Sequence, residues 1–201
     1  MRTIKNSFIK LAVNPKPITQ LLNNKDLVNV YLTQASILNN FSKVFGYRNE
    51  TLATRFYNIL AEGFKDCHIY LPVFLIKLTG LIGGDPLHIN YFGFRLLDSD
   101  LKDEIHASDI ADIIKNALEF CPDSVLDRNY PVLSGLVIER AKTDKRCRCA
   151  LYQEMVALFN TFYELNERNV NCKVPIDFPT YCTTAGISVL GLEFRDKLLM
   201  L

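Results

Sequence analysis

Residues 94–114 read FRLLDSDLKDEIHASDIADII, and this stretch decides how the rest of the chain is interpreted. Acidic side chains occupy its middle, and apolar residues flank them at spacings of three and four, which are typical of helices that bury one face. The stretch therefore predicts a helix, an acidic loop and a second helix. The apolar positions of the two helices are Phe94, Leu97, Ile110, Ile113 and Ile114.

A twelve-residue loop that starts at Asp98 resembles the calcium-binding loop of the EF-hand. Asp98, Asp100 and Asp109 fall at ligand positions one, three and twelve. Ile105 falls at position eight, where an EF-hand loop forms a short antiparallel ladder with its neighbour. The resemblance implies a weak metal site whose candidate ligands are Asp98, Asp100, Glu104 and Asp109.

Several residues of this loop depart from the EF-hand pattern. Lys102 at position five places a cation where the family has an oxygen ligand, and Asp103 stands at the position of the usual glycine. Asp109 is one methylene shorter than the usual glutamate. A lysine near a divalent ion costs Coulomb energy. We therefore expect weak calcium or magnesium binding at 98–109 at most, and no other cofactor.

Other stretches resemble parts of further EF-hands. Residues 67–78 (CHIYLPVFLIKL) are similar to the end of a second hand, with Ile69 at the ladder position. Residues 137–159 resemble a fourth hand in two registers that differ by one residue, and a first hand is faint between Ile37 and Leu60. The expected fold is all-α, with two pairs of EF-hands and minimal β ladders between the paired loops.

The helical periodicity and the glycines divide the chain. Gly83-Gly84 is the expected hinge between two lobes. The expected parts are an N-terminal arm (1–25), a degenerate N-terminal lobe (26–84), a C-terminal lobe (85–166) and a tail (167–201) that docks on its own groove or on a partner.

The fourth loop is basic, since Lys145, Arg146 and Arg148 surround Asp144. We expect no divalent ion there. The cluster is either a contact for an acidic partner, tubulin for example, or a solvated loop.

The order FSKVFG, RFYNI, KLTGLIGG, FRLLDSD resembles the calcineurin-B and neuronal-calcium-sensor group, and calaxin-like proteins most of all. Calaxin-like proteins belong to ciliary axonemes and associate with outer dynein arms. The resemblance implies a non-enzymatic structural protein of the axoneme that grips an amphipathic or coiled-coil helix; the alternative is a calcium-responsive subunit of the calcineurin-B kind. The candidate groove residues are Phe94, Ile110, Ile113, Ile114, Met155, Leu158 and Phe159.

Composition narrows the function classes. The chain has 201 residues and a net charge of +1, so no overall field favours nucleic acid. The longest apolar stretch, Ile69–Ile82, is too short and too interrupted to span a membrane. The N-terminal MRTIKNSFIK lacks the apolar run of a signal peptide, so we expect a cytoplasmic protein with six reduced cysteines.

The sequence offers little support for an enzyme. His68, His88 and His106 lie far apart without an evident nucleophile beside them. The spacing of Cys147 and Cys149 is not that of a common zinc site. We therefore expect no catalytic activity.

Overall fold

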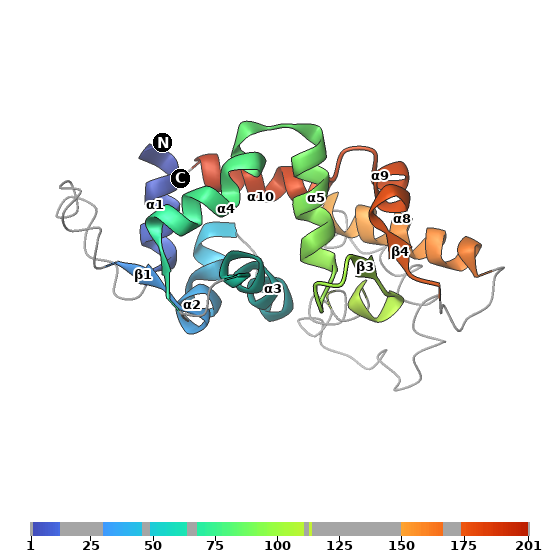
Figure 1. The fold of residues 1–201 in the computed structure, drawn as a ribbon, viewed down its shortest axis with the longest axis horizontal. Helices are drawn as coiled ribbons and strands as arrows, with labels where there is room; N and C mark the ends of the chain where they lie inside the picture. Colours follow the sequence, from blue (N-terminus) through green and yellow to red (C-terminus); the bar gives the residue numbers. More distant parts are fainter. Residues whose placement is uncertain are drawn as a thin grey trace. The chain divides into compact units, whose positions relative to one another are not determined.

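In its described residues, the computed structural model is mainly helical, with two pairs of two-residue antiparallel strands (Figure 1). This part of the predicted fold is confirmed. The described residues are 2–12, 30–45, 49–63, 68–110, 113, 150–166 and 174–200. The chain forms two compact units: unit 1 is Met1–His88 with Phe194–Leu201, and unit 2 is Ile89–Glu193.

Unit 1 combines the helices that lie before residue 84 with the last turns of the final helix. Its elements are α1 (Arg2–Leu11), β1 (Tyr31–Leu32), α2 (Gln34–Phe45), α3 (Glu50–Ala61), β2 (Ile69–Tyr70) and α4 (Leu71–Gly83).

Unit 2 contains the acidic loop and the elements that pack around it. Its elements are the main part of α5 (Pro86–Leu97), β3 (Glu104–Ile105), α8 (Ala150–Leu165), β4 (Ile176–Asp177), α9 (Phe178–Ala185) and the start of α10 (Val189–Met200). Residues 107–110 are helical directly after β3.

Local side-chain chemistry fixes where the helices of unit 1 begin. Thr33 and Ser36 cap α2 reciprocally, since each side-chain oxygen accepts a hydrogen bond from the other residue's backbone N–H, at 2.9 and 3.1 Å. Asn49 caps α3 by accepting from the Leu52 N–H at 2.9 Å. At the end of α4, Gly84 adopts φ 79°, the left-handed conformation that glycine permits.

Each strand pair joins two segments that are distant in sequence. β1 pairs with β2 so that Leu32 lies opposite Ile69, and both side chains are buried. β3 pairs with β4 so that Ile105 lies opposite Ile176, and these are buried as well. The prediction that Ile69 and Ile105 lie in short ladders is therefore confirmed.

The helices that we predicted on both sides of a loop between Ile37 and Leu60 are present as α2 and α3. In the structure β1 precedes α2, so α2 follows a paired strand and α1 is the helix before it. We predicted that the N-terminal residues form either a loose arm or a short helix with a linker, and residues 2–11 form the helix α1. Phe8 of α1 is buried, and its ring lies 5.4 Å from that of Phe74 in α4.

Residues 137–149 of the expected fourth hand lie outside the described residues. The helix that we predicted to contain Met155 and Leu158 is present as α8. The structure places this helix, α8, before the paired strand β4, and α9 comes directly after β4.

The segment expected to be a docking tail is helical where the structure describes it. Residues 178–185 form α9 and residues 189–200 form α10. Phe194 and Leu198 are buried in unit 1. We had expected the tail to dock either on the groove of the C-terminal lobe or on a partner. The apolar residues of α10 were visible in the sequence, but their destination was not.

Candidate functional site

Asp98 closes the loop at residues 98–109 from the end of α5. Its side chain is fully buried, and its two carboxylate oxygens accept hydrogen bonds from the backbone N–H groups of Lys102 at 3.1 Å and Asp103 at 2.8 Å. Asp103 takes up the sharp turn with φ 64°. Burial raises the pKa of Asp98, while the two N–H groups and Arg95 oppose that rise.

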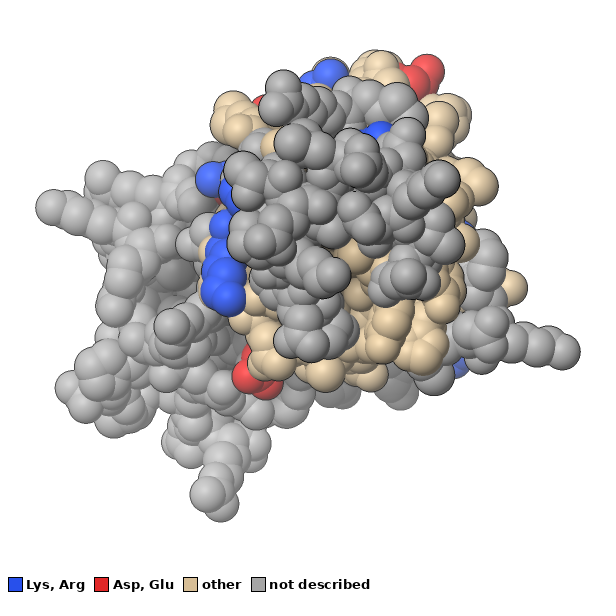
Figure 2. All heavy atoms as spheres, turned by 90° about the vertical axis from the view of Figure 1, so that its left-hand side faces the viewer, with Lys and Arg blue, Asp and Glu red and all other residues tan. Residues whose placement is uncertain are grey.

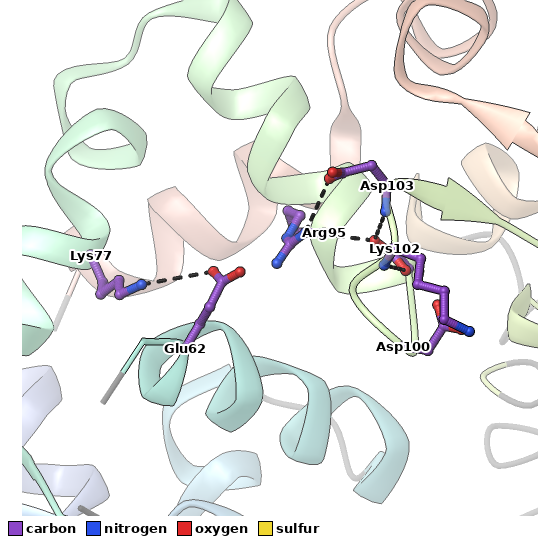
Figure 3. Close-up of polar contacts among 7 residues, drawn as sticks. Glu62, Lys77, Arg95, Asp100, Lys102 and Asp103 are labelled. Atoms are coloured by element: carbon purple, nitrogen blue, oxygen red, sulfur yellow. Dashed lines mark hydrogen bonds and ion pairs between the residues drawn. The ribbon is translucent and has the colours of Figure 1, made fainter. Parts of the chain in front are cut away.

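Arg95 supplies the cation beside this buried carboxylate. It lies on α5 one turn before Asp98, and its side chain is only 5% exposed. The guanidinium Nη1 lies 3.7 Å from Asp98 Oδ2 and 3.1 Å from Asp103 Oδ1 (Figure 3). The guanidinium also lies over the Tyr91 ring, 5.9 Å from its centroid. Arg95 thus connects α5 to the far side of the turn.

Lys102 neutralises a second carboxylate of the loop. Its Nζ lies 2.5 Å from Asp100 Oδ2, at the solvent-exposed side of the loop (Figure 3). The Lys102 hydrogen bond lowers the pKa of Asp100, and the same contact raises the pKa of Lys102. Two side-chain cations, Arg95 and Lys102, therefore contact three of the loop's acidic groups.

Asp109 faces the loop from its C-terminal end. One carboxylate oxygen accepts from the His106 N–H at 2.7 Å, and the other accepts from the Ser99 hydroxyl. Among the described residues, no three His, Cys, Asp or Glu side chains are grouped to hold a metal ion. The acids of this loop are arranged as hydrogen-bond acceptors and ion-pair partners.

The second loop shows a related contact. Glu62 caps the end of α3, and its carboxylate lies 3.7 Å from Lys77 Nζ of α4 (Figure 3). An acid at the start of this loop is thus also paired with a lysine of the protein.

A buried polar cluster lies elsewhere in unit 2. The Glu154 carboxylate of α8 accepts hydrogen bonds from the Tyr181 hydroxyl, the Ser188 hydroxyl at 3.0 Å and the Leu190 N–H at 2.7 Å. The Leu190 contact satisfies one of the free N–H groups at the start of α10. Burial, followed by the Glu154 charge, raises the pKa of Tyr181 well above its ordinary value. Glu154 therefore joins α8, α9 and the start of α10.

Asn90 and Gly93 of α5 complete this cluster. The Asn90 amide donates to the Gly186 carbonyl at 2.7 Å and accepts from the Ser188 N–H at 2.7 Å. A Cβ added at Gly93 would lie 2.6 Å from the Tyr181 hydroxyl, so only glycine fits beside it. α5 thus packs closely against the polar cluster.

The expected groove residues are part of a closed interior. Phe94, Ile110, Ile113, Met155 and Leu158 are all at most 1% exposed. As packed, they do not form a surface that a partner can reach. Ile114, the Phe159 side chain and the basic residues Lys145, Arg146 and Arg148 lie outside the described residues.

Arg95 and the Glu154 cluster were not predicted. The spacing of Arg95 and Asp98, three residues apart at a helix end, was a usable signal for an ion pair. Glu154 was given no role. Its partners Tyr181, Ser188 and Leu190 are 27 to 36 residues away, so no local pattern could indicate them.

A scan against family models gives no match, and neither does a search of the curated proteins. No helix in the described part of the chain has the length and apolar character needed to cross a bilayer. On the face shown in Figure 2, described Lys and Arg side chains form small groups beside uncharged surface. The described part of that face does not present a continuous basic surface.

Proposed function

We propose that this chain is a degenerate EF-hand protein that works as a non-enzymatic docking component of a larger assembly without needing a divalent ion. The observation that carries the proposal is the buried Arg95 guanidinium between Asp98 and Asp103. A side-chain cation there balances the charge that an EF-hand loop balances with calcium.

The backbone of the loop supports the EF-hand assignment. Asp98, at position one, accepts the N–H groups of positions five and six, and position six has the positive φ for which EF-hands use glycine. Ile105, at position eight, lies in a two-residue antiparallel strand. These features agree in a single register that starts at Asp98.

The ion pairs support the loss of ion dependence. A divalent ion at this loop would have to displace Arg95 and Lys102 from the same carboxylates. Displacing Arg95 also requires moving a side chain that is 95% removed from solvent and stacked near Tyr91. Because Arg95 and Lys102 already hold the loop in its folded conformation, calcium binding would not shift it to a different one.

The polar cluster of unit 2 supports a structural role over a catalytic one. Ser188 and Tyr181 are fully buried, and Glu154 is 6% exposed. A nucleophile must reach its substrate. These hydroxyls instead contact the carboxylate and the N-terminus of α10, which is a packing function.

The location and partner of the proposal come from the resemblance to calaxin-like proteins. We propose the ciliary axoneme as the site, with a dynein-arm or doublet-microtubule protein as partner, presented as an amphipathic or coiled-coil helix. Expression of the tagged chain in ciliated cells tests this location. Signal along the axoneme supports it, and exclusion from the cilium contradicts it.

Ion dependence is tested by titrating the purified chain with calcium and with magnesium in a calorimeter and in thermal unfolding. We expect no heat and an unchanged Tm. The double variant R95M/K102N should gain stabilisation by either ion, because its loop carboxylates lose both cations. K77M, which removes the lysine paired with Glu62, is the matched control and should gain none.

The runner-up is a calcium-responsive subunit of the calcineurin-B kind. One observation favours it: Lys102 is 73% exposed and can swing away from Asp100. Heat from the unmodified chain at micromolar calcium would support this reading and contradict the ion-independent one.

A further inference from the structure

The last turns of α10 insert two apolar side chains into unit 1. Phe194 and Leu198, four residues apart and therefore on one side of the helix, are both fully buried. Met200, near the end of the same helix, is 77% exposed. The segment thus has a defined inward face.

The Phe194 ring lies among three phenylalanines of α2 and α3. Its centroid is 4.4 Å from that of Phe45, 5.9 Å from that of Phe41 and 5.7 Å from that of Phe56. These distances are typical of favourable aromatic pairs. Phe194 is therefore a central member of the unit 1 core, although more than 130 residues separate it from these rings.

The two other helices of unit 1 also reach the segment. The Ser7 hydroxyl of α1 donates to the Leu198 carbonyl at 3.0 Å, which satisfies a free carbonyl near the end of α10. A Cβ added at Gly84, directly after α4, would lie 3.0 Å from the Arg195 guanidinium. The segment is therefore held from α1, α2, α3 and the end of α4 (Figure 1).

We propose that the apolar interior of unit 1 is a helix-binding site whose resident is the chain's own segment 194–200. A partner helix with an aromatic residue and a leucine four positions apart competes with that segment for the site. This inference rests on the proposed docking function and names its surface. Because the resident is covalently attached, a partner competes against a high effective concentration, and the segment limits access.

The test is complementation of the full-length variant F194A/L198A by a synthetic peptide of residues 187–201. The variant should unfold at a lower temperature than the unmodified chain. The peptide should raise its Tm by about 5 °C or more at concentrations near one hundred times the Kd, because it binds the vacated site of the folded state only. The unmodified chain and M200A should show no shift, because their sites are occupied.

The same peptide with alanine at 194 and 198 is the control ligand and should have no effect. If the variant is largely unfolded at the start, restoration of its helical circular dichroism by the peptide replaces the Tm shift as the readout. The inference is overturned if the peptide changes neither property, if the alanine peptide acts equally well, or if the unmodified chain responds as much as the variant.

The outcome is separable from that of the ion titration, since Phe194 and Leu198 lie in unit 1 and the loop at 98–109 lies in unit 2. Failed complementation together with an ion-insensitive unmodified chain removes this inference alone. Successful complementation together with calcium heat removes the ion-independent function but leaves the helix-binding site in unit 1.

Discussion

The two units share a local arrangement of strands and helices but differ in the side chains of their interiors. Each contains a pair of two-residue strands that is followed by helices, and in each pair the inward residues are apolar and buried. The interior of unit 1 includes a cluster of phenylalanine rings. The interior of unit 2 includes the Glu154 carboxylate with Tyr181 and Ser188. The shared arrangement of strands and helices therefore depends on the inward strand residues more than on the rest of the interior.

The outward residues of the strand pairs differ as well. Tyr31 lies opposite Tyr70 in unit 1, with ring centroids 6.0 Å apart. In unit 2, Glu104 lies opposite Asp177, which places two acids on neighbouring strands. Like charges in directly opposed positions oppose pairing. The repulsion is offset because Asp177 also caps α9, where it accepts a hydrogen bond from the Thr180 N–H at 2.9 Å.

The largest expected effect comes from opening the aromatic core of unit 1. F45A removes a fully buried ring that contacts those of Phe41, Phe56 and Phe194. It should cost about 3–5 kcal/mol and lower Tm by on the order of 10 °C in thermal unfolding. I76A is the control in the same unit, since Ile76 is 70% exposed, and an equal loss in both variants would contradict the assigned core.

The polar interior of unit 2 should be less costly to disturb. E154Q removes the charge that accepts two hydroxyl groups and the Leu190 N–H, and should cost about 1.5–3 kcal/mol in urea unfolding. Y181F removes one donor and should cost about 1 kcal/mol. The two losses should not add in the double variant, because both residues share one network. Strict additivity would show that the cluster is not a unit.

The cap of α9 should give a smaller effect that depends on pH. The Thr180 hydrogen bonds lower the pKa of Asp177 below its ordinary 3.8. Its stabilisation is therefore complete above that pH and is lost as the pH falls through the lower, folded-state value. D177A should cost about 1 kcal/mol at pH 7. The Tm difference from the unmodified chain should shrink between pH 5 and pH 2, and a constant difference would contradict a charged cap.

The smallest effect concerns the opposed acids. E104K places an opposite charge across from Asp177 and should stabilise unit 2 by about 0.2–1 kcal/mol at low salt. The gain should decline as salt is added. A loss of stability would mean that the His106 contact of Glu104, at 3.8 Å, outweighs the repulsion.

The sequence was sufficient for the elements whose signals are local. The apolar periodicity of residues 49–61, 69–82, 87–97 and 151–165 predicts helices, and α3, α4, α5 and α8 lie close to these bounds. The acidic loop predicted the ladder residue Ile105. Its strand partner Ile176 was missed because a two-residue strand next to Pro175 is too short to give a periodic signal. Leu32 was missed because β1 is equally short.

The candidate site was predictable in part. Lys102 at position five and Asp103 at position six were read from the loop itself. Burial of Arg95 was not predicted, because charged residues are assigned to the exposed face of a helix. The packing of α10 in unit 1 could not be predicted from the sequence either, because the rings around Phe194 belong to helices far away in the chain.

The central claim, that the protein's own cations close the loop at 98–109, is tested most directly by amide hydrogen exchange at Lys102 and Asp103. Both N–H groups donate to the buried Asp98. The account predicts slow exchange in EDTA and the same rate after calcium is added. Fast exchange in EDTA that becomes slow only with calcium would contradict it.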